Sequence, residues 1–264
     1  MKKNEHYTFG DTELAARRLA LLARVFEPSS TQLFGSLAPV EGKLGLDFGS
    51  GPGHTTRLVA DSTSLEHVIG LDQSAKLLEV AACRHADARL SFVQCDVTRL
   101  PLPTPRALLL YSRFLLTHLR DPARVVSAWA YAALPGARLV LEETASMRGE
   151  HPAFSRYYAL VEQMQAHYGQ RMYVGKELAA IAREAAPLWT IERAEIAVSE
   201  LPATNMAELH AMNLRTWSND AFARANYDPE ELAELERTLA RIAIGEISTG
   251  PVVLGMGQVV LRRG

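Results

Sequence analysis

Short runs of apolar residues alternate with longer amphipathic stretches between residues 40 and 145. The short runs fit buried strands, and the stretches between them carry apolar residues at helical spacing. This alternation predicts a doubly wound α/β fold, in which a parallel sheet has helices on both faces. The first predicted strand begins at Leu44, and the next four span His67–Leu71, Leu90–Gln94, Leu108–Tyr111 and Arg138–Leu141.

Helical patterns lie on both sides of this region. Asp11 or Thr12 can cap a helix with leucines at helical spacing, which predicts a helical cap over residues 1–36. No linker or repeat divides the chain, so we expect one domain, residues 1–264, with a central part at 37–145 and a C-terminal part at 146–264. In the C-terminal part the pattern predicts helices over 153–168, 174–186, 204–217 and 229–243, and strands over Trp189–Ser199 and Val252–Leu261.

Composition narrows the possible partners. The chain has 264 residues, 22% of them charged, with a formal net charge of −2 and no block of Lys and Arg, so we expect no nucleic-acid partner. No apolar run is long enough to span a bilayer, and the first residues are too polar for a signal peptide, so we expect no membrane partner. Cys83 and Cys95 lack CxxC spacing and fit reduced thiols, which favours a cytoplasmic protein. No His, Asp and Glu grouping has metal spacing, so we expect no metal.

The most informative segment is LGLDFGSGPGHTTRLVA, Leu44–Ala60, which indicates a strand, a tight turn and a helix. Gly49 permits the turn, and Gly51 and Gly53 let the backbone approach a ligand without a Cβ in the way. The free N–H groups at the start of the following helix would face that ligand. Dinucleotide folds use G-x-G-x-x-G, but position 54 is His, so the motif here is G-x-G-x-G.

Carboxylates follow the next two predicted strands. Asp72 lies about twenty residues beyond the glycine turn, where a carboxylate can accept the ribose hydroxyls of a nucleoside. Asp96 follows the third strand, and Leu134-Pro135-Gly136 precedes the fifth. In this order, residues 40–145 resemble the class I S-adenosylmethionine-dependent methyltransferases of the small-molecule type.

The resemblance implies S-adenosylmethionine as the cofactor and a Rossmann-like seven-stranded sheet whose last strand is antiparallel. Residues 37–145 would then bind the cofactor, and 146–264 would face the acceptor. About fifty residues separate the last two predicted strands, and insertions of this length often form a lid. We therefore expect helical lid insertions, at residues 150–175 and 203–245, over the carboxyl edge of the sheet.

The resemblance and the strand ends together suggest a set of cofactor-binding residues. Asp96 would accept a hydrogen bond from the adenine amino group or cap the segment after it, and Asp47 would fix the glycine turn by accepting hydrogen bonds from backbone N–H groups. An Arg and a Tyr near the N-terminus often close over the methionine carboxylate in this family, and Arg suits a carboxylate because it binds in a bidentate manner. The full set is Tyr7, Arg18, Asp47, Gly49, Ser50, Gly51, Gly53, Asp72, Gln73, Asp96, Val97, Ser112 and Arg113.

Methyl transfer from a sulfonium is an in-line displacement, for which positioning and desolvation supply most of the acceleration. A base is needed only when the acceptor must lose a proton. Glu143, at the end of the fifth strand, and His151, just beyond it, are the candidate catalytic residues, whereas we interpret His118 as structural. Ring side chains of the lid could form the wall of an acceptor pocket, although most of them would simply pack the lid helices onto the sheet. They are Tyr157, Tyr158, His167, Tyr168, Tyr173, His210 and Trp217.

The sequence therefore predicts S-adenosylmethionine-dependent methyl transfer to a small organic acceptor. One alternative is a nicotinamide-dependent oxidoreductase, which His54 in place of a third glycine disfavours. The other is a non-catalytic S-adenosylmethionine-binding protein. The acceptor, the atom that is methylated and the oligomeric state stay open.

Overall fold

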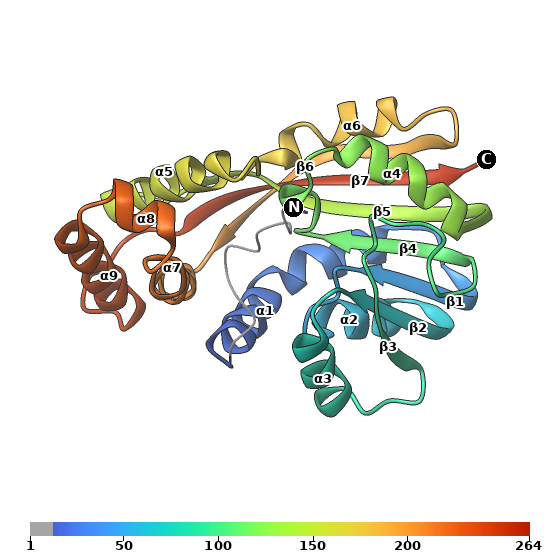
Figure 1. Cartoon of the computed structure of the whole chain (residues 1–264), viewed down its shortest axis with the longest axis horizontal. Coiled ribbons are helices and arrows are strands. Elements are labelled where there is room, and N and C mark those ends of the chain that lie inside the picture. Colours follow the sequence, from blue (N-terminus) through green and yellow to red (C-terminus); the bar gives the residue numbers. More distant parts are fainter. Residues whose placement is uncertain (1–12) are drawn as a thin grey trace.

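The computed structural model describes residues 13–264, which are built around a seven-stranded sheet of order β3-β2-β1-β4-β5-β7-β6 (Figure 1). Pairing is parallel from β3 to β5, and β7 runs antiparallel to both β5 and β6. The strands are β1 (Glu41–Phe48), β2 (Ser64–Asp72), β3 (Leu90–Gln94), β4 (Ala107–Arg113), β5 (Ala133–Arg148), β6 (Trp189–Leu201) and β7 (Val252–Arg263). The α-helices are α1 (Glu13–Ser36), α2 (His54–Ser62), α3 (Ala75–Arg84), α4 (Pro122–Trp129), α5 (Pro152–His167), α6 (Leu178–Glu184), α7 (Ala203–Trp217), α8 (Ala221–Asn226) and α9 (Pro229–Ala243).

Both faces of the central strands are buried. Side chains alternate along a strand, so Leu110 of β4 packs on the face covered by α4 and α6, whereas Leu109 and Tyr111 pack on the face covered by α1 and α2. The strands are therefore apolar on both faces, as buried parallel strands are. This confirms the predicted doubly wound, Rossmann-like sheet with an antiparallel last strand.

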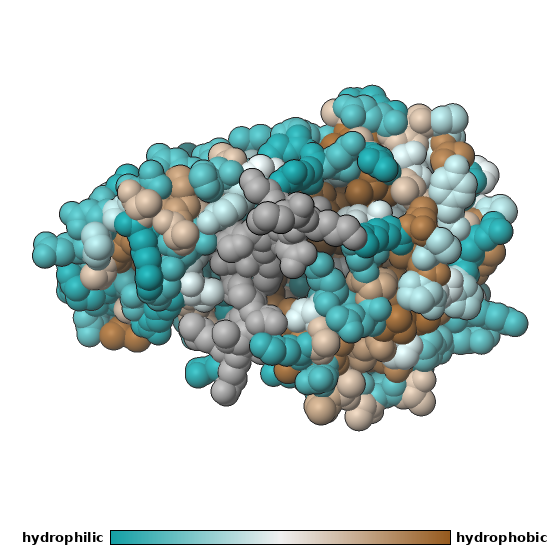
Figure 2. Space-filling view, in the orientation of Figure 1, coloured by the Kyte–Doolittle hydropathy of each residue, from teal (hydrophilic) through white to brown (hydrophobic). Residues whose placement is uncertain are grey.

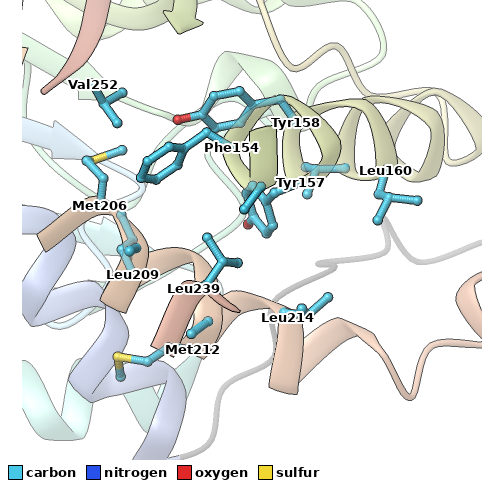
Figure 3. Close-up of a cluster of buried hydrophobic side chains, with 14 of the residues drawn as sticks. Phe154, Tyr157, Tyr158, Leu160, Met206, Leu209, Met212, Leu214, Leu239 and Val252 are labelled. Carbon is cyan, nitrogen blue, oxygen red and sulfur yellow. The ribbon is translucent and has the colours of Figure 1, made fainter. Parts of the chain in front are cut away.

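A second part of the molecule surrounds the extended ends of β5, β6 and β7, where α5, α7, α8 and α9 gather (Figure 1). These helices share an apolar core in which Phe154 and Tyr157 of α5 lie near Met206 of α7 and Leu239 of α9 (Figure 3). On the face seen in Figure 2, the outer surface of this part is mainly hydrophilic. The predicted helical insertions are thus present as a packed layer of helices.

A buried polar cluster joins α1 to the sheet. Glu142 of β5 accepts hydrogen bonds from the Tyr111 hydroxyl at 2.6 Å and the Gln258 amide at 2.8 Å. Ser30 of α1 accepts from Arg113 at 2.9 Å, and its hydroxyl lies 3.3 Å from the Tyr111 oxygen, to which it can donate. Because buried polar groups need partners, this cluster defines how α1 sits on the sheet.

Three elements differ from the prediction. Leu134-Pro135-Gly136 was expected before the fifth strand but lies inside β5. The strand accommodates it through an irregularity, since Gly136 adopts φ 75° and the β4–β5 pairing shifts register there. The helix predicted over 174–186 is divided into a short 3₁₀ turn, Val174–Lys176, and α6, and a Cβ at Gly175 would collide with the β5 backbone. The pattern did not reveal α8. The predicted boundary at residue 36 coincides with the end of α1, whereas the one at 145 falls within β5.

Candidate active site

A cavity of about 740 Å³ opens at the carboxyl ends of β1, β2, β4 and β5. In open α/β sheets, ligands bind at this edge. At one end it is lined by the glycine turn after β1 and by the residues that follow β2 and β3. The helices α1, α5 and α7 line the rest of the cavity together with Met147 and Met172, and α1 also reaches the glycine turn through Leu19. This part of the wall is termed the helical end.

The three glycines of the turn differ in their surroundings. Gly49, Gly51 and Gly53 all have positive φ, at 73°, 52° and 83°, which favours glycine. At Gly51 a Cβ would meet only a Leu19 methyl carbon at 3.8 Å, so the backbone there forms an open cradle on the cavity. At Gly53 a Cβ would come within 2.9 Å of the Phe92 ring, so this glycine serves the packing of α2 and does not line the cavity.

Asp47 lies behind the turn and does not line the cavity. Its buried carboxylate accepts hydrogen bonds from the hydroxyls of Thr55 and Thr56, both at 2.7 Å. Burial raises its pKa to about 6, while these hydroxyls lower it. It therefore supports the turn through the first residues of α2, whereas the expected partners were backbone N–H groups.

Asp72 ends β2 beside the cradle. Its carboxylate accepts hydrogen bonds from the Gly51 N–H at 2.9 Å and from the Ser74 N–H at 2.8 Å. Burial raises its pKa, and these backbone hydrogen bonds lower it. Each carboxylate oxygen has about two lone pairs, so both can still accept a ligand hydroxyl. Ser50 and Gln73 line the same part of the cavity.

Asp96 and Val97 line the cavity after β3. Asp96 accepts hydrogen bonds from the Thr98 N–H at 3.0 Å and hydroxyl at 2.5 Å, and its second oxygen pairs with Arg99 at 2.8 Å. The carboxylate thus caps the segment after it, as one of the two interpretations stated, while still facing the cavity. Adenine contact stays a prediction.

The last two residues of β4, Ser112 and Arg113, have different surroundings. Ser112 is buried in the sheet and does not line the cavity, whereas the adjacent Arg113 is buried and does. The Arg113 guanidinium lies 5.6 Å from the centre of the Phe114 ring. Arg18 of α1 also lines the cavity, and its Nη1 donates to the Asn213 side-chain oxygen at 3.3 Å. Tyr7, the other candidate for the methionine carboxylate, lies outside the described residues.

The two catalytic candidates lie in different places. Glu143 lines the cavity, and its buried carboxyl accepts the Leu116 N–H at 2.6 Å. Burial raises the Glu143 pKa to about 8, so the protonated form predominates near pH 7. His151 does not line the cavity, because its ring caps α5 by accepting the Ala153 N–H at 3.2 Å. His118 does line it, and burial lowers its pKa to about 4.

Of the polar groups at the helical end, Arg18 was a sequence candidate and Tyr157 and His210 belong to the lid residues expected to form an acceptor pocket, whereas Asn213 and Gln165 were not predicted. Asn213 of α7 donates to the Tyr157 hydroxyl at 2.9 Å, and the His210 ring stacks on the Tyr157 ring with centres 4.2 Å apart. Gln165 of α5 also lines this end. The spacing of Met206, His210 and Asn213 along α7 would have revealed a shared face, but not what that face meets.

Metal-ligand clusters and membrane-spanning helices are both absent among residues 13–264. No group of three or more His, Cys, Asp or Glu side chains among them could hold a metal ion. None of the helices in the described part of the chain is both long and apolar enough to cross a membrane.

Comparison with known proteins agrees with this geometry. Residues 46–141 match the methyltransferase domain family. A Mesorhizobium loti S-adenosylmethionine-dependent methyltransferase shares 23% identity and a TM-score of 0.51, over 90% of this chain and 97% of that one. Phosphoethanolamine N-methyltransferase 2 of Haemonchus contortus, solved with S-adenosylmethionine, shares 18% identity and a TM-score of 0.53, over 98% of this chain and 58% of that one. No curated protein matches the sequence significantly.

The glycine turn, the sheet order and the family match define the class of this protein. Residues 46–141 match a methyltransferase domain, and the sheet has the strand order of the Rossmann-like methyltransferase fold. The cofactor of this protein is S-adenosylmethionine. The cavity suits this cofactor, because Gly51 offers open backbone and the Asp72 carboxylate can accept hydrogen bonds from hydroxyl groups.

Proposed function

We propose that the protein methylates a small organic acceptor held in the helical end of its cavity. The observation that carries this proposal is that one continuous cavity joins Gly51 and Asp72 to residues of α1, α5 and α7. A cofactor on the glycine turn would therefore have room beside it for a second molecule. A buried, concave and mainly apolar site is typical for small molecules.

The proposed roles follow the two ends of the cavity. Gly51 and Asp72 would hold the ribose, and Asp96 and Val97 would border the adenine. The buried guanidinium of Arg18 would attract the methionine carboxylate. When bound, S-adenosylmethionine supplies a methyl group that its sulfonium already activates for in-line displacement. The chain's own task is then to hold the acceptor in line and to exclude water.

The helical end supports the exclusion of water. Met206, Leu209 and Val161 face the cavity from α7 and α5, and these helices share their own apolar core. Glu143, the one catalytic candidate that lines the cavity, holds the segment after β4 through Leu116. We propose that it positions this segment, and that a base is required only for an acceptor that must lose a proton.

The family match and the cavity do not favour the two alternatives. In a nicotinamide-dependent enzyme, a third glycine would stand at position 54, which here is His. A protein that only binds the cofactor would not need the additional space that this cavity offers at its helical end. A net charge of −2 without a basic block also disfavours a nucleic-acid substrate.

The test measures S-adenosylhomocysteine released by the purified protein when S-adenosylmethionine is incubated with a library of small organic acceptors, or with RNA or DNA. We expect product with members of the small-molecule library, little dependence on ionic strength, and no product from the Asp72→Ala variant. Product formed only with nucleic acid, and lost as salt rises, would contradict the proposal. Cofactor binding without product from any substrate class would favour the non-catalytic alternative.

A further inference from the structure

The helical end carries little formal charge. Among the described residues that α1, α5, α7, Met147 and Met172 contribute to the cavity, Arg18 bears the formal charge, and it is positive. The carboxylates Asp72 and Asp96 line the opposite end. Glu143 also lines the cavity, and its carboxyl is already engaged by the Leu116 N–H. An ammonium group at the helical end would thus find no carboxylate among the residues that α1, α5, α7, Met147 and Met172 contribute.

The walls of this end are otherwise apolar and adaptable. Met147, Met172 and Met206 contribute three thioether side chains, and Val161 and Leu209 contribute branched aliphatic ones. Methionine side chains adjust to ligands of irregular shape. The walls therefore suit an apolar body, and the affinity for it would come from burial rather than from charge.

Two polar atoms at this end have no hydrogen-bond partner within the described part of the chain. They are Oε1 of Gln165 and Nδ1 of His210, and both side chains are buried. The other His210 nitrogen, Nε2, already meets the Tyr158 hydroxyl at 3.1 Å. A buried polar atom without a partner costs about 1–3 kcal/mol, so a bound ligand that supplies the partner gains affinity.

These atoms also specify the partner's chemistry. The Gln165 oxygen only accepts hydrogen bonds, so its partner must donate. The neutral His210 ring offers either a donor or a lone pair at Nδ1, depending on which nitrogen carries the proton. A hydroxyl group both donates and accepts, so it satisfies either arrangement without bringing charge into the cavity.

We propose that the acceptor is an uncharged, mainly apolar molecule bearing a hydroxyl group, and that Gln165 and His210 are the residues that recognise this hydroxyl. The proposal rests on the proposed function, since it places the acceptor in the helical end. It makes both residues determinants of specificity and assigns neither of them a proton-transfer step. The Tyr157 ring stacks on the His210 ring, and the Tyr158 hydroxyl is hydrogen-bonded to His210 Nε2.

The test uses the full chain saturated with S-adenosylhomocysteine and two probes of the same apolar body. These are 2-naphthol, which is neutral, and 2-naphthylmethylamine, which is a cation at pH 7. Calorimetry would measure both affinities. We expect 2-naphthol to bind at least tenfold more tightly. Equal or tighter binding of the ammonium probe, or no binding of either probe, would overturn the proposal.

Matched substitutions assign the effect to the two residues. His210→Phe keeps a ring on Tyr157 but removes both nitrogens, and Gln165→Met keeps the length of the side chain but removes the amide. Each should weaken 2-naphthol binding about fivefold or more. The controls are His167→Phe and Gln163→Met, exposed positions on α5 that do not line the cavity, and both should leave the affinity unchanged.

Cofactor affinity separates this inference from the proposed function. If S-adenosylmethionine binds with unchanged affinity to His210→Phe and Gln165→Met, but 2-naphthol affinity is also unchanged, the hydroxyl assignment is wrong and the proposed function stands. If the wild-type protein forms no S-adenosylhomocysteine with any small acceptor, the proposed function fails, whatever the probes show. Circular dichroism would confirm that each variant keeps its fold.

Discussion

The Gly51 N–H donates a hydrogen bond to the Asp72 carboxylate at 2.9 Å, which joins the turn after β1 to the end of β2. These residues are 21 positions apart in sequence, yet they form adjacent parts of the same cavity wall. Any group held by the cradle at Gly51 therefore lies beside a carboxylate. This relationship makes the two residues the most direct tests of the cofactor end.

Replacing Asp72 by Ala should weaken S-adenosylmethionine binding by at least an order of magnitude. The change removes hydrogen bonds to a charged group, each worth about 1.5–3 kcal/mol, and frees the Gly51 N–H that shapes the cradle. Calorimetry on the folded variant measures the effect. Glu66→Ala is the control, since Glu66 is exposed on the same strand and does not line the cavity. Unchanged affinity in Asp72→Ala would show that the ribose assignment is wrong.

Alanine at Gly51 and at Gly53 should have different consequences. Both residues have positive φ, so each change strains the backbone by about 1–2 kcal/mol. At Gly51 the added methyl enters the cradle, so cofactor affinity should fall while unfolding changes little further. At Gly53 the methyl meets Phe92, so the free energy of unfolding should fall more. Equal effects of both changes on cofactor affinity and on unfolding would contradict this division.

Glu143 should make stability depend on pH. Its pKa is raised from 4.5 in the unfolded chain to about 8 in the folded one, so between these values the folded state binds more protons. The stability that is present below pH 4.5 is therefore lost as pH rises toward 8, by about 1.4 kcal/mol for each pKa unit. Glu143→Gln should reduce this slope in denaturant unfolding, because an amide has no proton to lose.

The control for the pH dependence of unfolding is Glu150→Gln, since Glu150 is exposed beyond the end of β5. Its loss should leave the dependence of unfolding on pH unchanged. If the Glu143→Gln protein shows the same slope as the wild type, the buried carboxyl does not hold its proton in the folded state. Its proposed part in positioning Leu116 would be tested separately by the rate of methyl transfer.

The helices α5, α7 and α9 should close over the cavity as one body. α5, α7 and α9 share a core that includes Phe154, Met206 and Leu239, so their amide protons should gain protection together. Hydrogen exchange followed without ligand, with S-adenosylhomocysteine, and with 2-naphthol added would show this. Identical protection in all three states would mean that these helices are a fixed part of the fold and that no lid closes.

The sequence by itself predicted the end of the cavity that holds the glycine turn and Asp72. Each of its parts is local, because a strand, the turn after it and the next strand together occupy some thirty residues. Glycines in a turn and a carboxylate at the end of the next strand therefore stay recognisable in a linear pattern. The same reasoning predicted that Gly51 and Asp72 lie together, whereas the antiparallel last strand was predicted from the family resemblance. It also predicted that Gly53 faces the ligand, whereas Gly53 packs against Phe92, a neighbour that no linear pattern shows.

Only the tertiary structure shows which side chains meet at the helical end of the cavity. Arg18 meets Asn213 across 195 residues, and Gln165 and His210 come from helices separated by α6 and β6. Such contacts depend on how α1 docks on the sheet and how α5 packs on α7, which local propensity does not specify. The same limit applied to His151, whose position beyond β5 suggested chemistry, while its ring caps α5. A side chain's neighbours follow from packing, so its access to the cavity becomes visible only in three dimensions.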